Sequence, residues 1–320
     1  MKTFAAGLAL ALAAFAAPVA AQGYPDRPIK IVVPFGPGGF TDVAARILQK
    51  ELAPAIGQPI IIENKPGAGS TIGTGEVANA KPDGYTLVMI STTHVISPHL
   101  YKKVPYDPIK SFTPVMKLAE GPYVLVVHPS LGVGTVSELL ALARSKPGTI
   151  DYASSGNGSA QHLVGALFNS MAGVRMNHVP YKGSNQAMND LVGGQVTVSF
   201  VGVPNALPHL ANGKLKALGV STARRYAELP DVPSIAEAGV AGYDATVWLG
   251  LLAPQGTPRE IVQKLSATIS KVLSSPEARK LMASAGVDVA TSTPEDFDRL
   301  MQEELARWGK VVRDTGASVN

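Results

Sequence analysis

The chain has 320 residues, of which 46% are hydrophobic and 16% charged, with no cysteine and a formal net charge of +4. This small charge, carried by Lys and Arg residues that are scattered without runs, argues against nucleic-acid binding. Without cysteine we expect neither disulfides, nor a lipidated cysteine anchor, nor a cysteine nucleophile. The length favours two globular domains, since domains commonly have ~100 to 200 residues.

The first 21 residues have the features of a secretory signal peptide. Lys2 precedes an apolar run over 5–17, and small residues follow at 19–21. The run is shorter than the ~20 apolar residues that a membrane span requires. We therefore predict cleavage near Ala21 and export of a soluble mature chain that starts near Gln22.

The first structural unit of the mature chain predicts an anion site. An alternating apolar strand, 29–33, leads into the Gly- and Pro-rich turn 34–39 and then into Thr41 and Asp42, which are common at helix N-termini. Such a turn directs backbone N–H groups toward an anion. The Gly-Lys-Ser/Thr of a Walker loop is absent, and Thr41 stands where a dinucleotide fingerprint needs its third glycine. The sequence therefore favours a small anion over a nucleotide.

The rest of the chain alternates between apolar strands and helical patterns, with turns rich in Gly, Ser, Thr or Asn between them. This alternation predicts an α/β fold, and in open α/β sheets ligands bind beyond the carboxyl ends of the strands. Three helices, beginning near Pro258, Pro276 and Pro294, close the chain. The predicted strands are 60–63, 85–90, 123–127, 150–153, 217–220 and 248–253, and the other predicted helices are 74–80, 136–146 and those that open after the turns 154–162, 182–185 and 200–205.

Five motifs give the chain a resemblance to a known family over the whole mature length. In order they are PFGPGGFTD, NKPGAGS, KPDGYTL, YASSGNGSAQHL and HVPYKGSNQAMNDLVGGQV. This set resembles the Bug-type (TctC-like) solute receptors of tripartite tricarboxylate transporters. The resemblance implies a type II periplasmic binding protein of the Venus flytrap kind, with mixed, mostly parallel sheets flanked by helices. It also implies a monomer that captures a small organic carboxylate in the periplasm and delivers it to membrane permease subunits, without a cofactor or metal.

The resemblance further implies how the domains and the ligand site are arranged. Domain one would hold residues 24–122 and 246–320, domain two residues 123–245, and the chain would cross between them twice. Asp42 is assigned to capping a helix and not to ligand contact. The ligand-binding residues implied are Phe35, Gly38, Gly39, Thr41, Ser91, Thr92, His94, Ser155, Asn157, Ser159, His162, Tyr181, Lys182, Gly183, Ser184, Phe200 and Val203.

Each of these residues also has a purely structural interpretation. Glycines in tight turns serve positive φ angles, and the serines of 154–159 serve as helix caps. His94 could equally be a packed, hydrogen-bonded residue, and Lys182 a solvated one. Relatives that accept amino acids are expected to carry an acidic residue near 200–203, where this chain has none. We therefore expect a mono- or dicarboxylate without an amine, because a buried ammonium would lack a counter-charge.

The alternative class is an exported α/β hydrolase that acts on a small carboxylate or ester. The sequence has no GxSxG elbow and no HExxH motif. A triad built on Ser155 or Ser159 with His162 lacks an identifiable third member. His94 and His99 are five residues apart across a proline, which is a poor arrangement for a shared metal ion.

Overall fold

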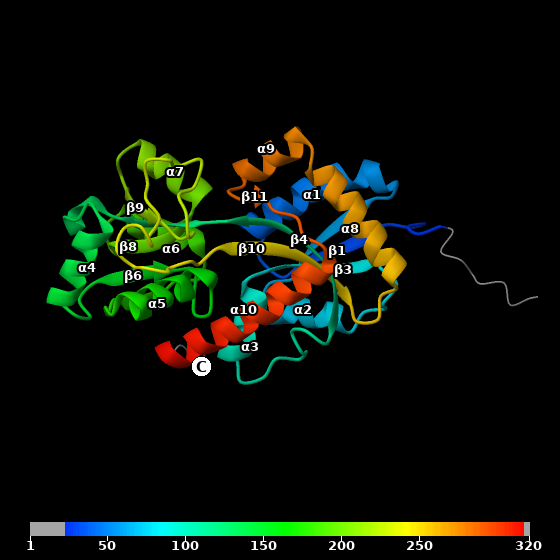
Figure 1. Ribbon diagram of the computed structural model, residues 1–320, viewed down its shortest axis with the longest axis horizontal. Coiled ribbons are helices and arrows are strands. Elements are labelled where there is room, and N and C mark those ends of the chain that lie inside the picture. The colour runs from blue at the N-terminus through cyan, green and yellow to red at the C-terminus, as the bar shows by residue number, and fades with distance from the viewer. Residues whose placement is uncertain (1–22, 317–320) are drawn as a thin grey trace, which may run out of the picture.

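The computed structural model describes residues 23–316 and forms two lobes that lie side by side (Figure 1). The elements of the first lobe are β1 (Ile29–Val33), α1 (Phe40–Ile56), β2 (Ile60–Asn64), α2 (Thr71–Ala78), β3 (Thr86–Ser91), α3 (Thr93–Leu100), β4 (Phe112–Gly121), β10 (Val247–Pro254), α8 (Arg259–Leu273), α9 (Pro276–Ser284), β11 (Asp288–Val289) and α10 (Pro294–Thr315). The elements of the second lobe are β5 (Tyr123–Val127), the 3₁₀ turn η1 (Pro129–Leu131), α4 (Val136–Ser145), β6 (Asp151–Ser154), α5 (Ala160–Ala172), β7 (Asn177–Pro180), α6 (Ser184–Val192), β8 (Val198–Gly202), α7 (Val203–Ala211) and β9 (Lys216–Val220).

Each lobe is built on one mixed sheet. The first sheet has the strand order β11-β4-β10-β3-β1-β2 and the second the order β7-β6-β8-β5-β9. The predicted class, an α/β protein with mixed sheets flanked by helices, is confirmed. Parallel pairs are not in the majority, however: of the nine strand pairings in the described chain, four are parallel and five antiparallel. The strands β4, β5 and β10, which lie where the chain passes between the lobes, account for the antiparallel pairs.

Interior strands of each sheet are apolar because both of their faces are covered. Every residue of β5 and of β10 is buried. This pattern is the continuous apolar run expected of strands packed on both faces, in place of the alternation of a half-exposed strand. Gly250 in β10 has no side chain for a steric reason, since a Cβ atom there would lie 2.0 Å from Cζ of Phe297 in α10.

Helix α10 connects the two lobes in addition to the two chain crossings. It contacts α3 and β4 of the first lobe and α5 of the second, and Figure 1 shows it running from one lobe to the other. Trp308 is buried in an apolar cluster that includes Phe168 and Tyr243 of the second lobe. The Arg307 guanidinium donates a hydrogen bond to the carbonyl of Asp244, on the segment that returns to the first lobe.

The two lobes also touch at a second place. The Tyr226 hydroxyl donates to Oδ1 of Asp288 at 3.3 Å, which joins the segment after β9 to β11. A Cβ atom at Gly286 would come within 2.1 Å of Cδ of Pro204, so the turn before β11 packs directly against the start of α7. Motion of one lobe relative to the other must therefore involve these contacts.

Several predicted boundaries differ from the structure. Helix α2 covers 71–78 where the sequence pattern indicates 74–80, and α3, β4 and β11 occur where no regular element is predicted. The predicted signal peptide, residues 1–21, lies outside the described residues. Within 23–316, no helix is long and apolar enough to cross a membrane.

Candidate functional site

The turn between β1 and α1 is held in place by side chains of α1 and β2. The Asp42 carboxylate accepts hydrogen bonds from the Gly38 N–H at 2.9 Å, from Nε of Arg46 at 3.0 Å and from Nδ2 of Asn64 at 2.8 Å. The same Asn64 amide donates to the Phe35 carbonyl at 3.1 Å. Gly38 has a φ of +80°, which favours glycine at this position. The network fixes the turn, whose glycines remain exposed.

Asp42 keeps its charge in this network. Burial raises the pKa of its carboxyl, but the hydrogen bonds from Arg46, Gly38 and Asn64 outweigh burial and hold the pKa below its usual value. The residue is the third of α1, whose N-cap is Gly39. It therefore reaches back past the helix start, as expected for a residue that caps without occupying the N-cap position. Because Asp42 occupies the Gly38 N–H, this group is not available to a ligand in this structure.

Thr41, like His94 at its Nδ1, buries a polar side-chain atom that has no hydrogen-bond partner among the described residues. Thr41 is 1% exposed, and the unpartnered atom is its hydroxyl oxygen. It is the second residue of α1, where the backbone N–H groups also lack partners within the helix. A buried hydroxyl without a partner is costly unless a ligand or a water completes it. The start of α1 therefore carries a hydroxyl group that no described residue pairs.

The polar residues at the end of β3 are occupied by neighbours within the protein. The Ser91 hydroxyl donates to Oγ1 of Thr93 at 3.2 Å, and Oγ1 of Thr92 accepts from the backbone N–H of Trp248 at 3.0 Å. His94 is fully buried, stacks on Tyr106, and donates from Nε2 to the Pro108 carbonyl at 2.8 Å. His94 thus has the contacts of the packed, hydrogen-bonded alternative.

In the second lobe, side chains occupy most N–H groups of the turn between β6 and α5. The N–H groups of Ser155, Gly156 and Gly158 donate to Oε1 of Gln161 at 2.9 Å, to Oγ of Ser154 at 3.1 Å and to Nδ1 of His162 at 3.2 Å. Ser159 is the N-cap of α5, and its Oγ accepts from the His162 N–H at 3.2 Å. Asn157 is exposed. As in the first lobe, a preformed turn precedes a helix start.

His162 forms a stacked pair with His178 of β7. Their ring centroids are 3.8 Å apart with an interplanar angle of 12°, and Nε2 of His178 is hydrogen-bonded to Oγ of Ser154 at 2.6 Å. Burial lowers the pKa of His162 to about 4, and burial together with the charge of His162 lowers that of His178 to about 3. Both imidazoles are therefore neutral near pH 7, and His162 Nδ1 can act as an acceptor.

The remaining predicted residues differ in their exposure. The Tyr181 backbone N–H donates to the Ser154 carbonyl at 3.0 Å, which places the turn after β7 beside the turn after β6. Gly183 is the N-cap of α6, while Lys182 and Ser184 are exposed. The side chains of Phe200 and Val203 are fully buried in apolar clusters of the second lobe. The structure thus brings the turns after β6 and β7 together but places these two apolar side chains in the core.

Asn64, Gln161 and His178 organise these turns although the sequence patterns do not single them out. Asn64 and Gln161 each bridge main-chain or carboxylate groups of a predicted ligand turn. Both lie inside the motifs NKPGAGS and SSGNGSAQH, which is the one sequence signal that points to them. Their roles follow from which main-chain atoms lie within reach, and this depends on the folded geometry.

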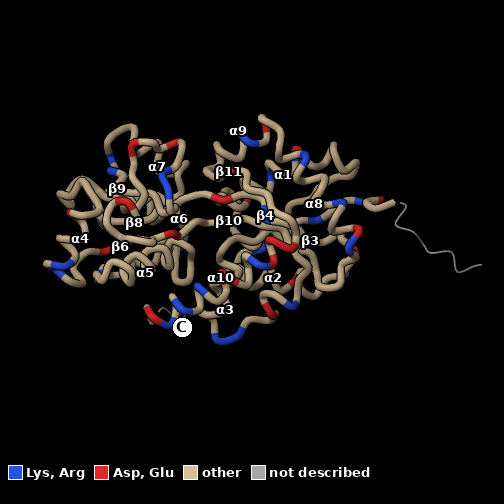
Figure 2. The backbone as a smooth tube through the Cα atoms, viewed as in Figure 1, with Lys and Arg blue, Asp and Glu red and all other residues tan. Residues whose placement is uncertain are grey.

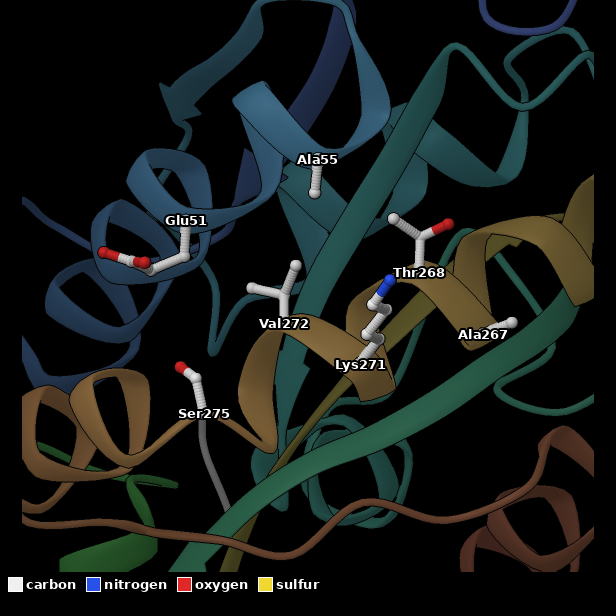
Figure 3. A pocket seen from close by; sticks show the side chains of 7 residues that line it. All are labelled: Glu51, Ala55, Ala267, Thr268, Lys271, Val272 and Ser275. Carbon is white, nitrogen blue, oxygen red and sulfur yellow. The ribbon is translucent and has the colours of Figure 1, made fainter.

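Two hollows of the described chain lie away from these turns. One, of about 550 Å³, is lined by Glu51 and Ala55 of α1, by four residues of α8 and by Ser275, as Figure 3 shows. The other, of about 290 Å³, lies between the ends of α5 and α10. Lys and Arg residues are interspersed with Asp and Glu over both lobes (Figure 2). In the described chain, no three His, Asp or Glu side chains are grouped so as to hold a metal ion.

Acid should destabilise the protein through its buried histidines. Burial lowers the pKa of His94 to about 4, against the opposing effect of the Pro108 carbonyl. Because an unfolded histidine titrates near 6.5, the unfolded state alone gains a proton as the pH falls from 6.5 toward 4. His94 by itself should thus cost about 2 kcal/mol at pH 5. Denaturant unfolding at pH 7.5 and pH 5 measures this effect, and equal free energies of unfolding would contradict it.

Two mixed α/β lobes with glycine-rich turns beyond the carboxyl ends of their strands define the class of periplasmic solute-binding proteins, and solved structures of that class superpose on the chain. The family described as the tripartite tricarboxylate transporter family receptor matches residues 44–317. The chain belongs to this family, as its motifs predict. The family consists of solute-binding receptors, so the hydrolase alternative is set aside.

Individual relatives support this assignment over nearly the full length. Protein BugT of Bordetella pertussis is 37% identical over 315 residues, which cover 98% of this chain and 97% of the relative. Rpa4515 of R. palustris, solved with adipate, is 37% identical with a TM-score of 0.85 and covers 92% of this chain and 99% of its own. MatC of Rhodopseudomonas palustris, solved with bound malate, is 38% identical with a TM-score of 0.80, and the match covers 90% of this chain and 99% of MatC.

Proposed function

We propose that the protein captures a small organic carboxylate between its two lobes and delivers it to the permease subunits of a tripartite tricarboxylate-type transporter. The observation that carries the proposal is the buried, unpartnered Thr41 hydroxyl at the start of α1, next to a glycine turn that is held open by Asp42. Two relatives from the same family, solved with adipate and with malate, support a carboxylate as the ligand.

The first lobe supplies one wall of the proposed site. A carboxylate oxygen at the start of α1 would accept from the Thr41 hydroxyl and from the free N–H groups of the first turn, which the helix dipole favours. Phe35, Gly38 and Gly39 shape this wall, and Ser91 and Thr92 lie at the end of the neighbouring strand β3. The contacts of His94 in the core favour a supporting role for it over ligand contact.

The second lobe supplies the opposing wall. Helix α5 begins after Ser159, and its first N–H groups, those of Ala160 and Gln161, point out of the helix N-terminus. Ser155, Asn157 and His162 belong to the same turn, and Tyr181 to Ser184 lie beside it. Phe200 and Val203 act from the core by fixing the end of β8.

The two lobes correspond to the two proposed domains, 24–122 with 246–320 and 123–245. The allocation of strands supports this division, because β4 ends at Gly121 in the first sheet and β5 begins at Tyr123 in the second. A ligand that contacts both walls only when they approach shifts an open–closed equilibrium, and the closed surface is what the permease recognises. In this proposal the mature chain is a periplasmic monomer, exported and cleaved near Ala21.

The ligand lacks an amine. None of the proposed site residues is acidic, and the nearby Asp42 carboxylate already accepts three hydrogen bonds. An ammonium buried there would have no counter-charge. Malate and aspartate differ by a hydroxyl in place of the amine, so they form a matched pair. Aspartate should bind about 100-fold more weakly than malate, or than the best amine-free analogue, since a difference of about 2.7 kcal/mol is 100-fold. Equal affinities by calorimetry would overturn this part of the proposal.

A thermal-shift screen of aliphatic, aromatic and amino carboxylates, followed by calorimetry, tests the proposal. A ligand at ~100 times its Kd should stabilise the protein by ~2.7 kcal/mol and raise Tm by several degrees. The protein should first be unfolded, dialysed and refolded so that no retained ligand masks the response. If the refolded protein is native and no carboxylate shifts Tm, the proposal fails.

Replacing Thr41 with valine should have opposite effects on stability and binding. Valine has the shape of threonine without the unpartnered hydroxyl, so the unliganded protein should gain about 1 kcal/mol, while carboxylate affinity should fall about tenfold. Thr74→Val is the matched control, because the Thr74 hydroxyl of the same lobe is also buried without a partner: the variant should gain similar stability but leave Kd unchanged. An unchanged Kd in Thr41→Val would show that the hydroxyl does not contact the ligand.

A further inference from the structure

Gln161 joins two turns of the second lobe through both ends of its amide. Its side chain is buried, with 7% of the residue exposed, although it lies in the first turn of α5. Oε1 accepts from the Ser155 N–H at 2.9 Å, and Nε2 donates to the Phe200 carbonyl at 2.9 Å. Acceptor and donor are each used once, on main-chain atoms of two different strand ends.

Strand β8 is paired with β5 along its whole length, but its direct pairing with β6 is short. The paired residues of β6 and β8 are Tyr152 with Val198 and Ala153 with Ser199, and Oγ of Ser199 also donates to the Ala153 carbonyl at 3.0 Å. Beyond this point one strand enters the turn 154–159 and the other leads into α7. The Gln161 amide spans the gap that opens between them, at Phe200, one residue after the pairing stops on β8, and at Ser155, two residues after it stops on β6.

The bridge determines how these turns are presented. Because Oε1 of Gln161 accepts from the Ser155 N–H, this group is not available to a ligand in this structure. Because Nε2 holds the Phe200 carbonyl, the last residues of β8 cannot move away from the 154–159 turn without leaving two buried polar groups unpaired. The amide therefore locks the two turns into one rigid wall.

We infer that Gln161 is a positioning residue that sets the spacing between the 154–159 turn and the end of β8, and thereby the length of carboxylate that the site prefers. The inference rests on the proposed function, since it concerns the second-lobe wall of that site. Without the bridge the two turns adopt several spacings. The affinity for the best ligand then falls in proportion to the fraction of molecules that keep the correct spacing. Ligands of other lengths lose less affinity, so the selectivity for one ligand length falls.

Asn169 provides a matched control on the same helix. Its amide bridges main-chain atoms in the same manner, with Nδ2 donating to the Met176 carbonyl at 2.9 Å and Oδ1 accepting from the Met176 N–H at 3.2 Å. It lies at the far end of α5, away from the ligand turns. Removal of this bridge tests the general effect of losing a buried amide without touching the wall.

The test compares Gln161→Met and Asn169→Leu with the wild type, with Kd measured by calorimetry for succinate, glutarate, adipate and pimelate. The expected result for Gln161→Met is a loss of about tenfold or more for the preferred length, as when only about a tenth of molecules keep the binding geometry, and a smaller ratio between the best and next-best lengths. Asn169→Leu should lower Tm but leave unchanged both the Kd for the preferred length and the ratio between the best and next-best lengths. A Gln161→Met variant with wild-type Kd values and ratios would overturn the inference.

A second variant keeps the test informative if Gln161→Met does not fold. Gln161→Glu still accepts from the Ser155 N–H but cannot donate to the Phe200 carbonyl. Its added charge weakens the binding of all dicarboxylates similarly, so the ratio of Kd values between ligand lengths still reports on the spacing. An unchanged ratio would also overturn the inference. If the wild type binds none of the four acids or of the wider carboxylate panel, the proposed function itself fails, which is a different outcome from an unchanged ratio.

Discussion

Replacing Asp42 with asparagine should reduce carboxylate affinity about 100-fold and lower the free energy of unfolding by about 2–3 kcal/mol. The carboxylate accepts hydrogen bonds from Gly38, Arg46 and Asn64, and asparagine would turn an NH₂ group toward at least one of these donors. Hydrogen bonds to a charged group contribute about 1.5–3 kcal/mol each, so one lost bond accounts for the stability effect. The affinity falls because the freed glycine turn is in the binding geometry in only about a hundredth of the molecules.

Asp83→Asn is the control for this substitution. Asp83 forms an ion pair with Arg27 in the same lobe, but the two side chains are 36% and 58% exposed. Exposed pairs contribute only about 0–1 kcal/mol, so stability should change little and Kd should not change. Wild-type affinity in Asp42→Asn, measured at a temperature where the variant is folded, would show that the Asp42 network does not hold the ligand turn.

Replacing Trp308 with alanine should cost about 3–5 kcal/mol of stability, the range for removing a large core aromatic. Trp308 is almost fully buried, and its indole N–H donates to Oε2 of Glu304 at 2.8 Å. Glu304 is itself 8% exposed, so the substitution both opens a cavity and removes a donor from a buried carboxylate. The cavity would lie where α10 joins the two lobes. Denaturant unfolding should therefore show a single transition in which both lobes unfold at a lower denaturant concentration than in the wild type.

Trp308→Phe separates the two contributions. Phenylalanine keeps an aromatic ring in the cluster but has no N–H group for Glu304, so the expected cost is about 1–3 kcal/mol. A loss below about 1 kcal/mol in Trp308→Ala would contradict the view that α10 stabilises both lobes through this side chain.

Strands and capped helices follow from the sequence where local chemistry decides them. The run 123–127 forms a strand with the predicted limits, because five apolar residues leave no other buried arrangement. Helix α10 begins after Thr293, whose hydroxyl accepts from the Asp296 N–H, as its Thr-Pro start indicates. Helix α3 could not be predicted in this way, since Pro98 lies inside it. Strand β4 contains Pro114 and follows a polar segment, so its pairing with β10 decides its conformation.

The turns and helix starts of the candidate site are predictable from the sequence, but their contacts are not. The glycine turns and helix starts lie where the motifs indicate. Local patterns do not reveal that Asp42 takes the Gly38 N–H or that Gln161 takes that of Ser155, because these bonds depend on the packing of several segments. His94 shows the same limit, since a polar residue after a strand is turned into the core by Tyr106 and Phe112.

The most direct test of the account is a crystal structure of the mature protein with the tightest-binding carboxylate from the screen. We expect one ligand between the lobes, with a carboxylate oxygen within hydrogen-bonding distance of the Thr41 hydroxyl and the start of α1, and with contacts to the start of α5. A ligand bound to one lobe alone, or in the hollow between α1 and α8, would contradict capture between the lobes.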